Sequence, residues 1–312
     1  MALNNWLTRE LPDGLTSAAV AIGVFDGVHI GHRKIISTLS RMAAKRGVPS
    51  LVLSFDPHPR TVVSPESAPT LLVSPARRAE LLRDAGADFV AFLRFTPELA
   101  RLEPMVFLDE ILGGDFSLAA LAVGNRWRFG RGAAGGVEEL ARFAALHGID
   151  FEGVGEVMRG GEVVSSSRTR QAIAAGRLRE AAGYLGRAPE LEGVVMPGLG
   201  IAAAKLEHPT ANFVPEYGVT PPDGVYAAKV RCVGGGCYSA ALNVGSSPTV
   251  RAANGLGRRV EAHLIDFSGD LYGERIVVEL VKFIRREKRF RSLEALRVQI
   301  AADVEKIREV LK

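Results

Sequence analysis

The sequence predicts an α/β protein in two parts: an N-terminal domain built on a parallel sheet, and a C-terminal small antiparallel β-barrel with a terminal helix. Residues 18–157 alternate short apolar runs with amphipathic helical segments, which is the pattern of a parallel sheet covered by helices. Past Pro189 the chain changes to closely spaced β-rich segments joined by Gly, Pro, Asn and Ser turns, which is typical of a small barrel. Apolar side chains then recur at three- and four-residue spacing over 293–307, which predicts a final helix.

The chain length agrees with two domains. A domain typically has about 100–200 residues, and this chain has 312. The change of pattern places the boundary near residue 187, so the predicted domains are residues 1–187 and 188–312. With 47% hydrophobic and 24% charged residues, the composition is that of a globular protein and excludes a disordered or fibrous chain.

Charge and cysteine content narrow the class of partners. The 39 basic and 35 acidic side chains give a net charge of +4, which suits anionic small molecules, and the sequence lacks the polybasic tail that would predict a nucleic-acid partner. Cys232 and Cys237 fit neither a zinc pattern nor a secreted disulfide framework. The sequence has neither the apolar core of a signal peptide nor a run of about 18 apolar residues, so it does not predict a membrane partner. We therefore expect a cytoplasmic protein that is a monomer or weak homo-oligomer.

Short apolar runs and their breakers define the elements of the first half. The strand at 18–25 ends in a Gly/Asp/His turn, and the helix that follows has one apolar face and ends at Gly47. Apolar runs predict four further strands, and amphipathic spacing predicts three further helices. The strands are 50–55, 89–95, 118–123 and 151–157, and the helices are 75–86, 104–112 and 137–147.

Glycine marks most element ends in the rest of the chain. Two short helical patterns, at 166–176 and 179–186, each end in Gly and complete the first domain. Three glycines between two β-rich segments predict a hairpin, and a helix that begins near Ser292 should pack one face on the barrel. The β-rich segments are 193–195, 224–233, 238–244, 259–267 and 275–281.

The turn after the first strand carries a candidate phosphate site. His29 and His32 lie three residues apart where the helix begins, so they share a helical face. The free amides and positive dipole end of a helix attract phosphate, and Gly23, Gly27 and Gly31 allow close approach of backbone to a polyphosphate. Two imidazoles there could donate hydrogen bonds to phosphoryl oxygens. The structural alternative is a turn with helix-capping histidines, and a metal site lacks a third ligand nearby.

Motifs of the first domain resemble those of one family. Residues 23–32 resemble the HxGH signature of the nucleotidyltransferase superfamily, and their Phe-Asp-Gly-Val prefix is similar to that of bacterial bifunctional riboflavin kinase/FAD synthetases. Residues 54–60 resemble that family's second strand-end motif, residues 122–130 its flavin-side loop, and residues 165–170 the Ser-Ser-Thr-x-x-Arg motif for ATP phosphates. The resemblance covers nearly the whole chain in order, and it implies a Rossmann-like nucleotidyltransferase domain followed by a kinase barrel.

The resemblance implies FAD biosynthesis in two steps. ATP phosphorylates riboflavin to FMN, and the phosphate of FMN then attacks the α-phosphorus of a second ATP, so that FAD forms and pyrophosphate leaves. No enzyme nucleophile is needed, so catalysis depends on positioning and charge stabilisation. The implied small-molecule substrates are riboflavin, FMN and ATP, with Mg²⁺ as the cofactor.

The implied site residues of adenylyl transfer follow from these motifs, with His29 and His32 as the catalytic pair. The implied ATP-binding residues are Gly23, Phe25, Asp26, Gly27, Gly31, Ser165, Ser166, Ser167 and Arg170. The implied flavin-binding residues are Asp56, Pro57, His58, Asn125, Arg126 and Phe129. Residues 125–127 depart from the usual family pattern. The structural alternatives are a helix cap for the serines, a turn for residues 56–59 and core packing for Trp127.

A second site is implied in the barrel. Residues 209–212, Pro-Thr-Ala-Asn, resemble the motif with which flavokinases hold Mg-ATP, and Thr210 and Asn212 offer the oxygen ligands that Mg²⁺ prefers. Glu261 aligns with the family's glutamate that accepts the proton of the ribityl hydroxyl, so it is the implied general base. Because Glu261 alternates with apolar residues in its strand, the structural alternative is a charge on the solvent side.

The phosphate loop upstream of Thr210 departs from the family. The segment from Gly198 to His208 lacks the usual arginine and the last glycine, and it carries Glu207 near an expected phosphate. Ser247 also stands where many relatives have arginine. The main prediction is a bifunctional enzyme, and the alternative is an FMN adenylyltransferase whose degenerate barrel serves as a flavin-binding or assembly module. A non-catalytic flavin-binding regulator and an aminoacyl-tRNA synthetase-like ligase are further alternatives.

Overall fold

The computed structural model divides the chain into two compact units, which are described one at a time. The first comprises residues 1–69 and 75–165, and the second comprises residues 70–74 and 166–312. The described residues are 3, 6–8, 11, 14–113, 117–196, 210–232, 235–246, 258–288 and 290–312.

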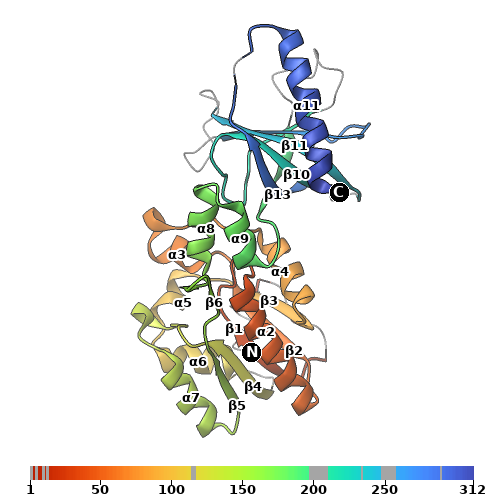
Figure 1. Cartoon of the computed structure of the whole chain (residues 1–312). Coiled ribbons are helices and arrows are strands. Elements are labelled where there is room, and N and C mark those ends of the chain that lie inside the picture. The colour runs from red at the N-terminus through yellow and green to blue at the C-terminus, as the bar shows by residue number, and fades with distance from the viewer. Residues whose placement is uncertain are drawn as a thin grey trace. The chain divides into compact units, whose positions relative to one another are not determined.

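A five-stranded parallel sheet forms the centre of the first unit (Figure 1). Its strands are β1 (Ser17–Ile22), β2 (Ser50–Phe55), β3 (Phe89–Leu93), β4 (Ser117–Gly124) and β5 (Asp150–Val154). They lie in the order β3-β2-β1-β4-β5, and every neighbouring pair is parallel. The inner strands are buried on both faces, which explains why they appear in the sequence as continuous apolar runs without polar alternation.

Helices and short connections complete the first unit. Proline at the first turn opens several of these helices, because its fixed φ suits that position and its missing N–H has no helical partner there. Gly47 ends the longest of them with φ 65° in the left-handed region. The helices are α2 (Ile30–Arg46), α3 (Pro59–Val63), α4 (Pro75–Asp84), α5 (Pro97–Arg101), α6 (Pro104–Leu112) and α7 (Val137–Leu146), with a small hairpin of β6 (Met158–Arg159) and β7 (Glu162–Val163).

The second unit is a closed antiparallel barrel, and its described residues include helices on both sides of the barrel segment in the sequence. Around the barrel the strands lie in the order β10-β11-β12-β9-β8-β13. Alternate residues of each strand, such as Val260, Ala262 and Leu264 in β12, fill the interior. The elements are α8 (Ser166–Ala174), α9 (Leu178–Leu185), β8 (Glu190–Met196), β9 (Thr210–Phe213), β10 (Gly224–Cys232), β11 (Cys237–Ser246), β12 (Arg258–Leu264), β13 (Arg275–Arg285) and α11 (Leu293–Leu311).

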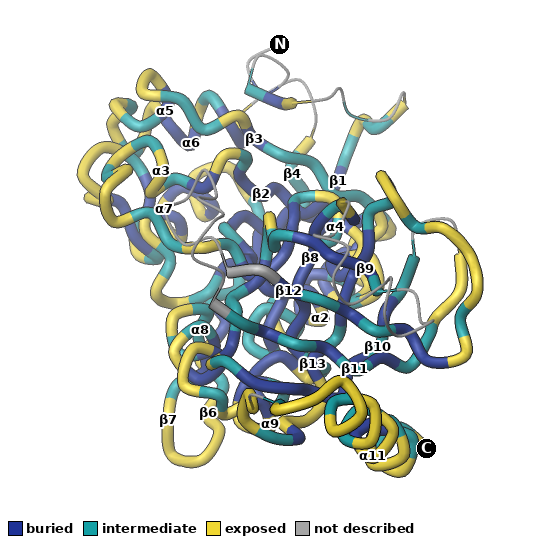
Figure 2. The backbone as a smooth tube through the Cα atoms, turned by 90° about the horizontal axis from the view of Figure 1, so that it is seen from above, coloured by how far each residue is buried: buried dark blue, intermediate teal, exposed yellow. Residues whose placement is uncertain are grey.

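The terminal helix α11 packs on the outside of the barrel by its second half. The Oγ atom of Ser292 accepts a 3.1 Å hydrogen bond from the amide of Ala295 and caps the helix. Ile307 is fully buried in a small cluster with residues of β10 and β13. The first half carries exposed Leu293, and Figure 2 shows the outer side of α11 as exposed. The start of α11 is therefore left to line a cavity.

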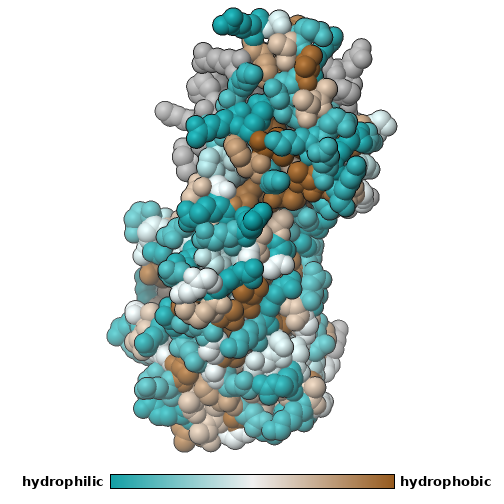
Figure 3. Space-filling view, in the orientation of Figure 1, coloured by the Kyte–Doolittle hydropathy of each residue, from teal (hydrophilic) through white to brown (hydrophobic). Residues whose placement is uncertain are grey.

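The fold class is as predicted, with local differences. β9, α3 and α5 were not predicted, because each has only four or five residues, too few for a periodic pattern. Helices α8 and α9 belong to the same compact unit as the barrel, while the predicted boundary near residue 187 stays a prediction. On the face shown in Figure 3, hydrophobic side chains gather over β10 and β13, and β13 carries exposed Val281 and Phe283.

Candidate active sites

The carboxyl ends of three adjacent strands bring together the candidate residues of the first unit. Because β2, β1 and β4 are parallel neighbours, the turns that follow them meet at one edge of the sheet. These turns contain residues 56–58, 23–29 and 125–129. The order of strands reverses between β1 and β4, and this switch point is where open α/β sheets bind ligands.

The turn after β1 has an unusual backbone. Phe25 and Val28 have φ of 52° and 41°, which side chains other than glycine rarely adopt, and Gly27 has φ of 77°. Both non-glycine side chains are buried, and so is Asp26. Burial holds the strained residues in place, and such strain is typical of segments that position a functional group.

His29 and His32 form a face-to-face pair at the start of α2. The Nδ1 atom of His29 accepts a 3.2 Å hydrogen bond from the backbone N–H of His32, so His29 caps the helix. Their rings stack with 3.5 Å between centroids. Because Nδ1 is an acceptor, neutral His29 carries its proton on Nε2 and can donate it. His29 therefore does cap the helix, as the structural alternative expected. The same hydrogen bond fixes the orientation of its ring, so that Nε2–H can serve as a donor in the proposed phosphate site.

His32 is held in its neutral form. Its ring meets the edge of the Phe25 ring with 5.2 Å between centroids, and its Nδ1 atom is buried without a hydrogen-bond partner in the described part of the chain. Burial, the neighbouring His29 and the positive charge of Arg78 lower the pKa of His32 well below its usual value. A neutral imidazole keeps one N–H to donate to a phosphoryl oxygen.

The predicted flavin-side residues lie in two of the three turns. His58 caps α3, since its Nδ1 atom accepts a 3.1 Å hydrogen bond from the amide of Arg60. Arg126 is exposed and forms an ion pair with Glu156. Phe129 is buried and stacks on Trp127 with 4.9 Å between ring centroids. Trp127 thus packs against the core, and a direct flavin contact of Phe129 stays a prediction.

The predicted triphosphate residues span the division between the units. Ser165 ends the first unit, whereas Ser166, Ser167 and Arg170 begin α8 in the second. The Nε atom of Arg170 donates a 2.7 Å hydrogen bond to the backbone oxygen of Thr70, which belongs to the same unit. The joint action of these residues with His29 on one triphosphate stays a prediction.

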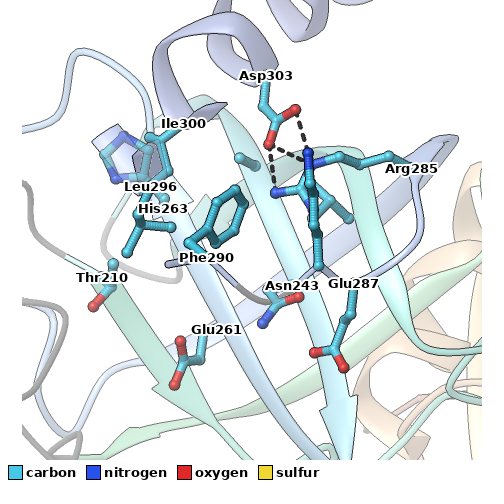
Figure 4. Close-up of a pocket in the computed structure, with 13 residues that line it drawn as sticks. Thr210, Asn243, Glu261, His263, Arg285, Glu287, Phe290, Leu296, Ile300 and Asp303 are labelled. Carbon is cyan, nitrogen blue, oxygen red and sulfur yellow. Dashed lines mark hydrogen bonds and ion pairs between the residues drawn. The ribbon is translucent and has the colours of Figure 1, made fainter. Parts of the chain in front are cut away.

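A cavity of about 540 Å³ lies between the outside of the barrel and the first half of α11 (Figure 4). Strand residues form one wall, the segment after β13 forms another, and α11 forms the third. Its lining combines apolar side chains with polar and charged ones, and such a combination can bind an apolar ring and orient polar groups. They include Thr210, Asn243, Glu261 and His263 from the strands, Arg285, Glu287, Lys288 and Phe290 from β13 and the segment after it, and Leu296, Ile300 and Asp303 from α11.

Strand pairing places Glu261 at the centre of the polar wall. Glu261 lies opposite Asn212 of β9 on one side and opposite Asn243 of β11 on the other. Directly paired residues of antiparallel strands point to the same face, so the three side chains form one row. His263 lies opposite Thr210 in the next row. Glu261 therefore lines a cavity whose opposite wall is α11. The structural alternative had expected this side chain on an open, solvent-facing side of the strand.

A buried ion pair joins the cavity walls. Asp303 of α11 is only 5% exposed, and both its oxygens accept hydrogen bonds from Nε of Arg285, at 3.1 and 2.9 Å. Gln299 donates a further bond of 3.0 Å to Asp303. Figure 4 shows this pair between α11 and the end of β13. Asn243 and Asp303 were not predicted as site residues, because only strand pairing and helix packing bring them to the cavity.

Thr210 also lines a second, smaller cavity of about 90 Å³. The other lining residues come from β8, β9, the end of β12 and the turn between β12 and β13, and that turn contributes Phe267, Leu271 and Tyr272. Thr210 therefore lines both cavities, and its role in holding Mg²⁺ stays a prediction. Three predicted features lie outside the described residues. They are the loop from Gly198 to His208 that differs from the family pattern, Pro209 and Ser247.

In the described part of the chain, no group of three His, Cys, Asp or Glu side chains is arranged to hold a metal ion. The hydroxyl of Thr210 and the amide oxygen of Asn212 are nonetheless hard donors next to the cavities, which suits Mg²⁺, because that ion takes few protein ligands when it also binds substrate phosphates. No helix among the described residues combines the length and apolar character needed to cross a bilayer.

Comparison with known proteins assigns both halves of the chain to families. Residues 12–168 match the FAD synthetase family, and residues 185–311 match the riboflavin kinase family. The bifunctional riboflavin kinase/FMN adenylyltransferases of Escherichia coli and Pseudomonas fluorescens are 35% and 38% identical to this chain, and the matches cover 91% of this chain and 90% and 89% of theirs. A solved Streptococcus pneumoniae structure, described as a macrolide-efflux protein, matches over 95% of both chains with a TM-score of 0.80 and 28% identity.

Fold and sites define a transferase with a nucleotidyltransferase-like α/β unit and a flavokinase-like barrel. The chain belongs to the bifunctional riboflavin kinase/FMN adenylyltransferase family. It carries both transferase domains, so the main prediction of function is confirmed, and the presence of a matching kinase domain supports it over the degenerate-barrel alternative.

Proposed function

We propose that this chain makes FMN at the cavity of the barrel and FAD at the sheet edge of the first unit, with ATP as the donor in both reactions. The observation that carries the proposal is that Glu261 and Asn243, which pair with each other across β12 and β11, line a cavity large enough for a flavin. Asn212 of β9 pairs with Glu261 on its other side, and the same chain carries the stacked His29 and His32.

In the kinase reaction, Glu261 accepts the proton of the terminal ribityl hydroxyl while that oxygen attacks the γ-phosphorus of ATP and ADP leaves. Phe290 and Leu296 offer apolar surface for the flavin ring. Thr210 and Asn212 would hold Mg²⁺, which when bound offsets the charge of the phosphates. Asn243 flanks the carboxylate of Glu261 and orients it.

In the adenylyl transfer, a phosphate oxygen of FMN bonds to the α-phosphorus of ATP as the bond to pyrophosphate breaks. Negative charge shifts onto the phosphoryl oxygens, where the imidazole N–H groups of His29 and His32 and the first amides of α2 stabilise it. Ser166, Ser167 and Arg170 bind the triphosphate, with the guanidinium suited to bidentate contact. Asp56, His58 and Asn125 contact the flavin side.

The remaining expectations concern the protein in the cell. Mg²⁺-dependence, a cytoplasmic location, a monomer or weak homo-oligomer, and the lack of nucleic-acid or membrane partners belong to this proposal. The net charge of +4 and the free thiols of Cys232 and Cys237 support it.

Two substitutions test the division of labour. His32→Gln should lower FAD formation from FMN by about 10²–10³-fold and leave riboflavin phosphorylation unchanged. Glu261→Gln should lower riboflavin phosphorylation by about 10²–10⁴-fold and leave FAD formation from supplied FMN unchanged. Exposed Glu309, changed to Gln, is the matched control for the second variant. Loss of both activities in either variant, with the fold intact, would contradict the proposal.

A further inference from the structure

Arg78 of α4 is a buried arginine to which neither motif nor family resemblance assigns a role. Its side chain is 1% exposed and is among the largest fully buried side chains of the described chain. Burying a guanidinium is costly unless its donors are hydrogen-bonded, so a buried arginine is retained where its geometry is needed.

The guanidinium of Arg78 joins the carboxyl ends of three neighbouring strands. Nη1 donates a 2.7 Å hydrogen bond to the backbone oxygen of Val24, directly after β1, and Nη2 donates a 3.0 Å bond to that of Phe55, the last residue of β2. The guanidinium also lies over the ring of Phe92 in β3, 5.0 Å from its centroid. Ser54 adds a 2.9 Å bond to the oxygen of Val24.

These contacts fix the starting points of two functional turns. The turn that leads to His29 and His32 begins at Val24, and the turn with the flavin-side residues begins at Asp56, next to Phe55. We propose that Arg78 is a positioning residue for adenylyl transfer, which holds these two turns in register and thereby sets the place of His32. The inference rests on the proposed role of His32.

Electrostatics supports this role. The positive charge of Arg78 contributes to the lowered pKa of His32, so the two groups lie within electrostatic reach of each other. Lysine cannot replace this arginine, because a single ammonium group lacks the planar fork that reaches two carbonyl oxygens at once.

The test is a double-mutant cycle in the full chain, with Arg78→Lys, His32→Gln and the double variant. Arg78→Lys should lower kcat for FAD formation by about tenfold to a hundredfold, since a displacement near 1 Å costs about a hundredfold, and should change KM for FMN much less. In the His32→Gln background, Arg78→Lys should lower kcat for FAD formation by less than about twofold. The effects of two residues that act through each other are not additive.

Controls separate positioning from general damage. Arg83→Lys, on the exposed side of the same helix, should leave kcat unchanged, and riboflavin phosphorylation by Arg78→Lys should equal that of the wild type. If Arg78→Lys does not fold, Phe92→Leu removes the ring beneath the guanidinium and should also lower only kcat for FAD formation. Equal losses in both backgrounds, or an unchanged kcat, overturn the role of Arg78. Full FAD formation by His32→Gln alone overturns the role of His32 instead.

Discussion

The imidazole rings of His29 and His32 stack with 3.5 Å between their centroids and 17° between their planes. Two rings this close repel each other when both are charged, so the doubly charged form of the pair is disfavoured. The hydrogen bond from the amide of His32 to Nδ1 of His29 holds the arrangement. The pair thus presents imidazole N–H donors at the positive end of α2, where phosphate binds best.

The absence of a side chain at Gly31 is predicted to allow the position that the His29 ring adopts. A Cβ at residue 31 would lie 3.0 Å from Cε1 and 3.1 Å from Nδ1 of His29, so the ring would have to move by a few tenths of an ångström. Alanine is otherwise favoured over glycine in a helix by about 1 kcal/mol. Gly31→Ala should therefore lower kcat for FAD formation at least about tenfold without loss of thermal stability. A fully active variant would contradict this account, and riboflavin phosphorylation is the internal control.

The lowered pKa of His32 predicts a pH-dependent stability. In the unfolded chain His32 has a pKa of about 6.5, whereas in the folded chain its pKa is well below that value. Below about pH 6.5 the unfolded chain binds a proton that the folded chain does not, so stability falls as pH drops through this window. NMR titration should show a His32 signal that is absent in His32→Gln and titrates well below pH 6.5. Titration of that signal at its ordinary pKa would sink this interpretation.

Asp303→Asn is predicted to weaken the wall of the barrel cavity. Breaking a buried ion pair by removing one charge costs about 3 kcal/mol, at the low end of the range because Arg285 keeps some exposure. The variant should show a lower unfolding temperature and a higher KM for riboflavin. Asp266→Asn, which removes the exposed ion pair of Asp266 with Arg308 of the same helix, should cost less than about 1 kcal/mol. Equal changes of the unfolding temperature and of KM in Asp303→Asn and Asp266→Asn would contradict the view that the Arg285–Asp303 ion pair holds the cavity wall.

Thr210→Val is predicted to separate the Mg²⁺ needs of the two reactions. Valine keeps the shape of threonine and removes the oxygen ligand, so the Mg²⁺ concentration for half-maximal FMN formation should rise several-fold. FAD formation from FMN should keep its Mg²⁺ dependence, because the catalytic pair proposed for that reaction, His29 and His32, lies in the other unit. Titration of MgCl₂ at fixed ATP measures both, and a parallel shift in both reactions speaks against the assignment.

Long, regular elements were predictable from the sequence. The strand at 50–55 and the helix at 104–112 have the predicted bounds, because continuous burial and amphipathic spacing leave a direct mark on the residue pattern. The alternation of residues in β12 predicted the face of Glu261, and the motif around His29 predicted a candidate phosphate site at the start of α2.

Features made by long-range packing were not predictable. β9 has four residues, and its strand character depends on pairing with β12. Asn243 and Asp303 reach the cavity only through register and helix docking. Arg78 appears in the sequence as one more charge on an amphipathic helix, and nothing in a helical pattern shows that its side chain turns inward to backbone carbonyls of two strands.

The central claim is that both flavin reactions occur on this chain. The most direct measurement incubates the purified protein with Mg²⁺ and ATP and either riboflavin or FMN, and separates the flavins by chromatography. The account predicts FAD from both substrates, with FMN as the intermediate when riboflavin is supplied. FAD from FMN alone, with riboflavin left unchanged, would contradict the account and show that the barrel has lost its kinase chemistry.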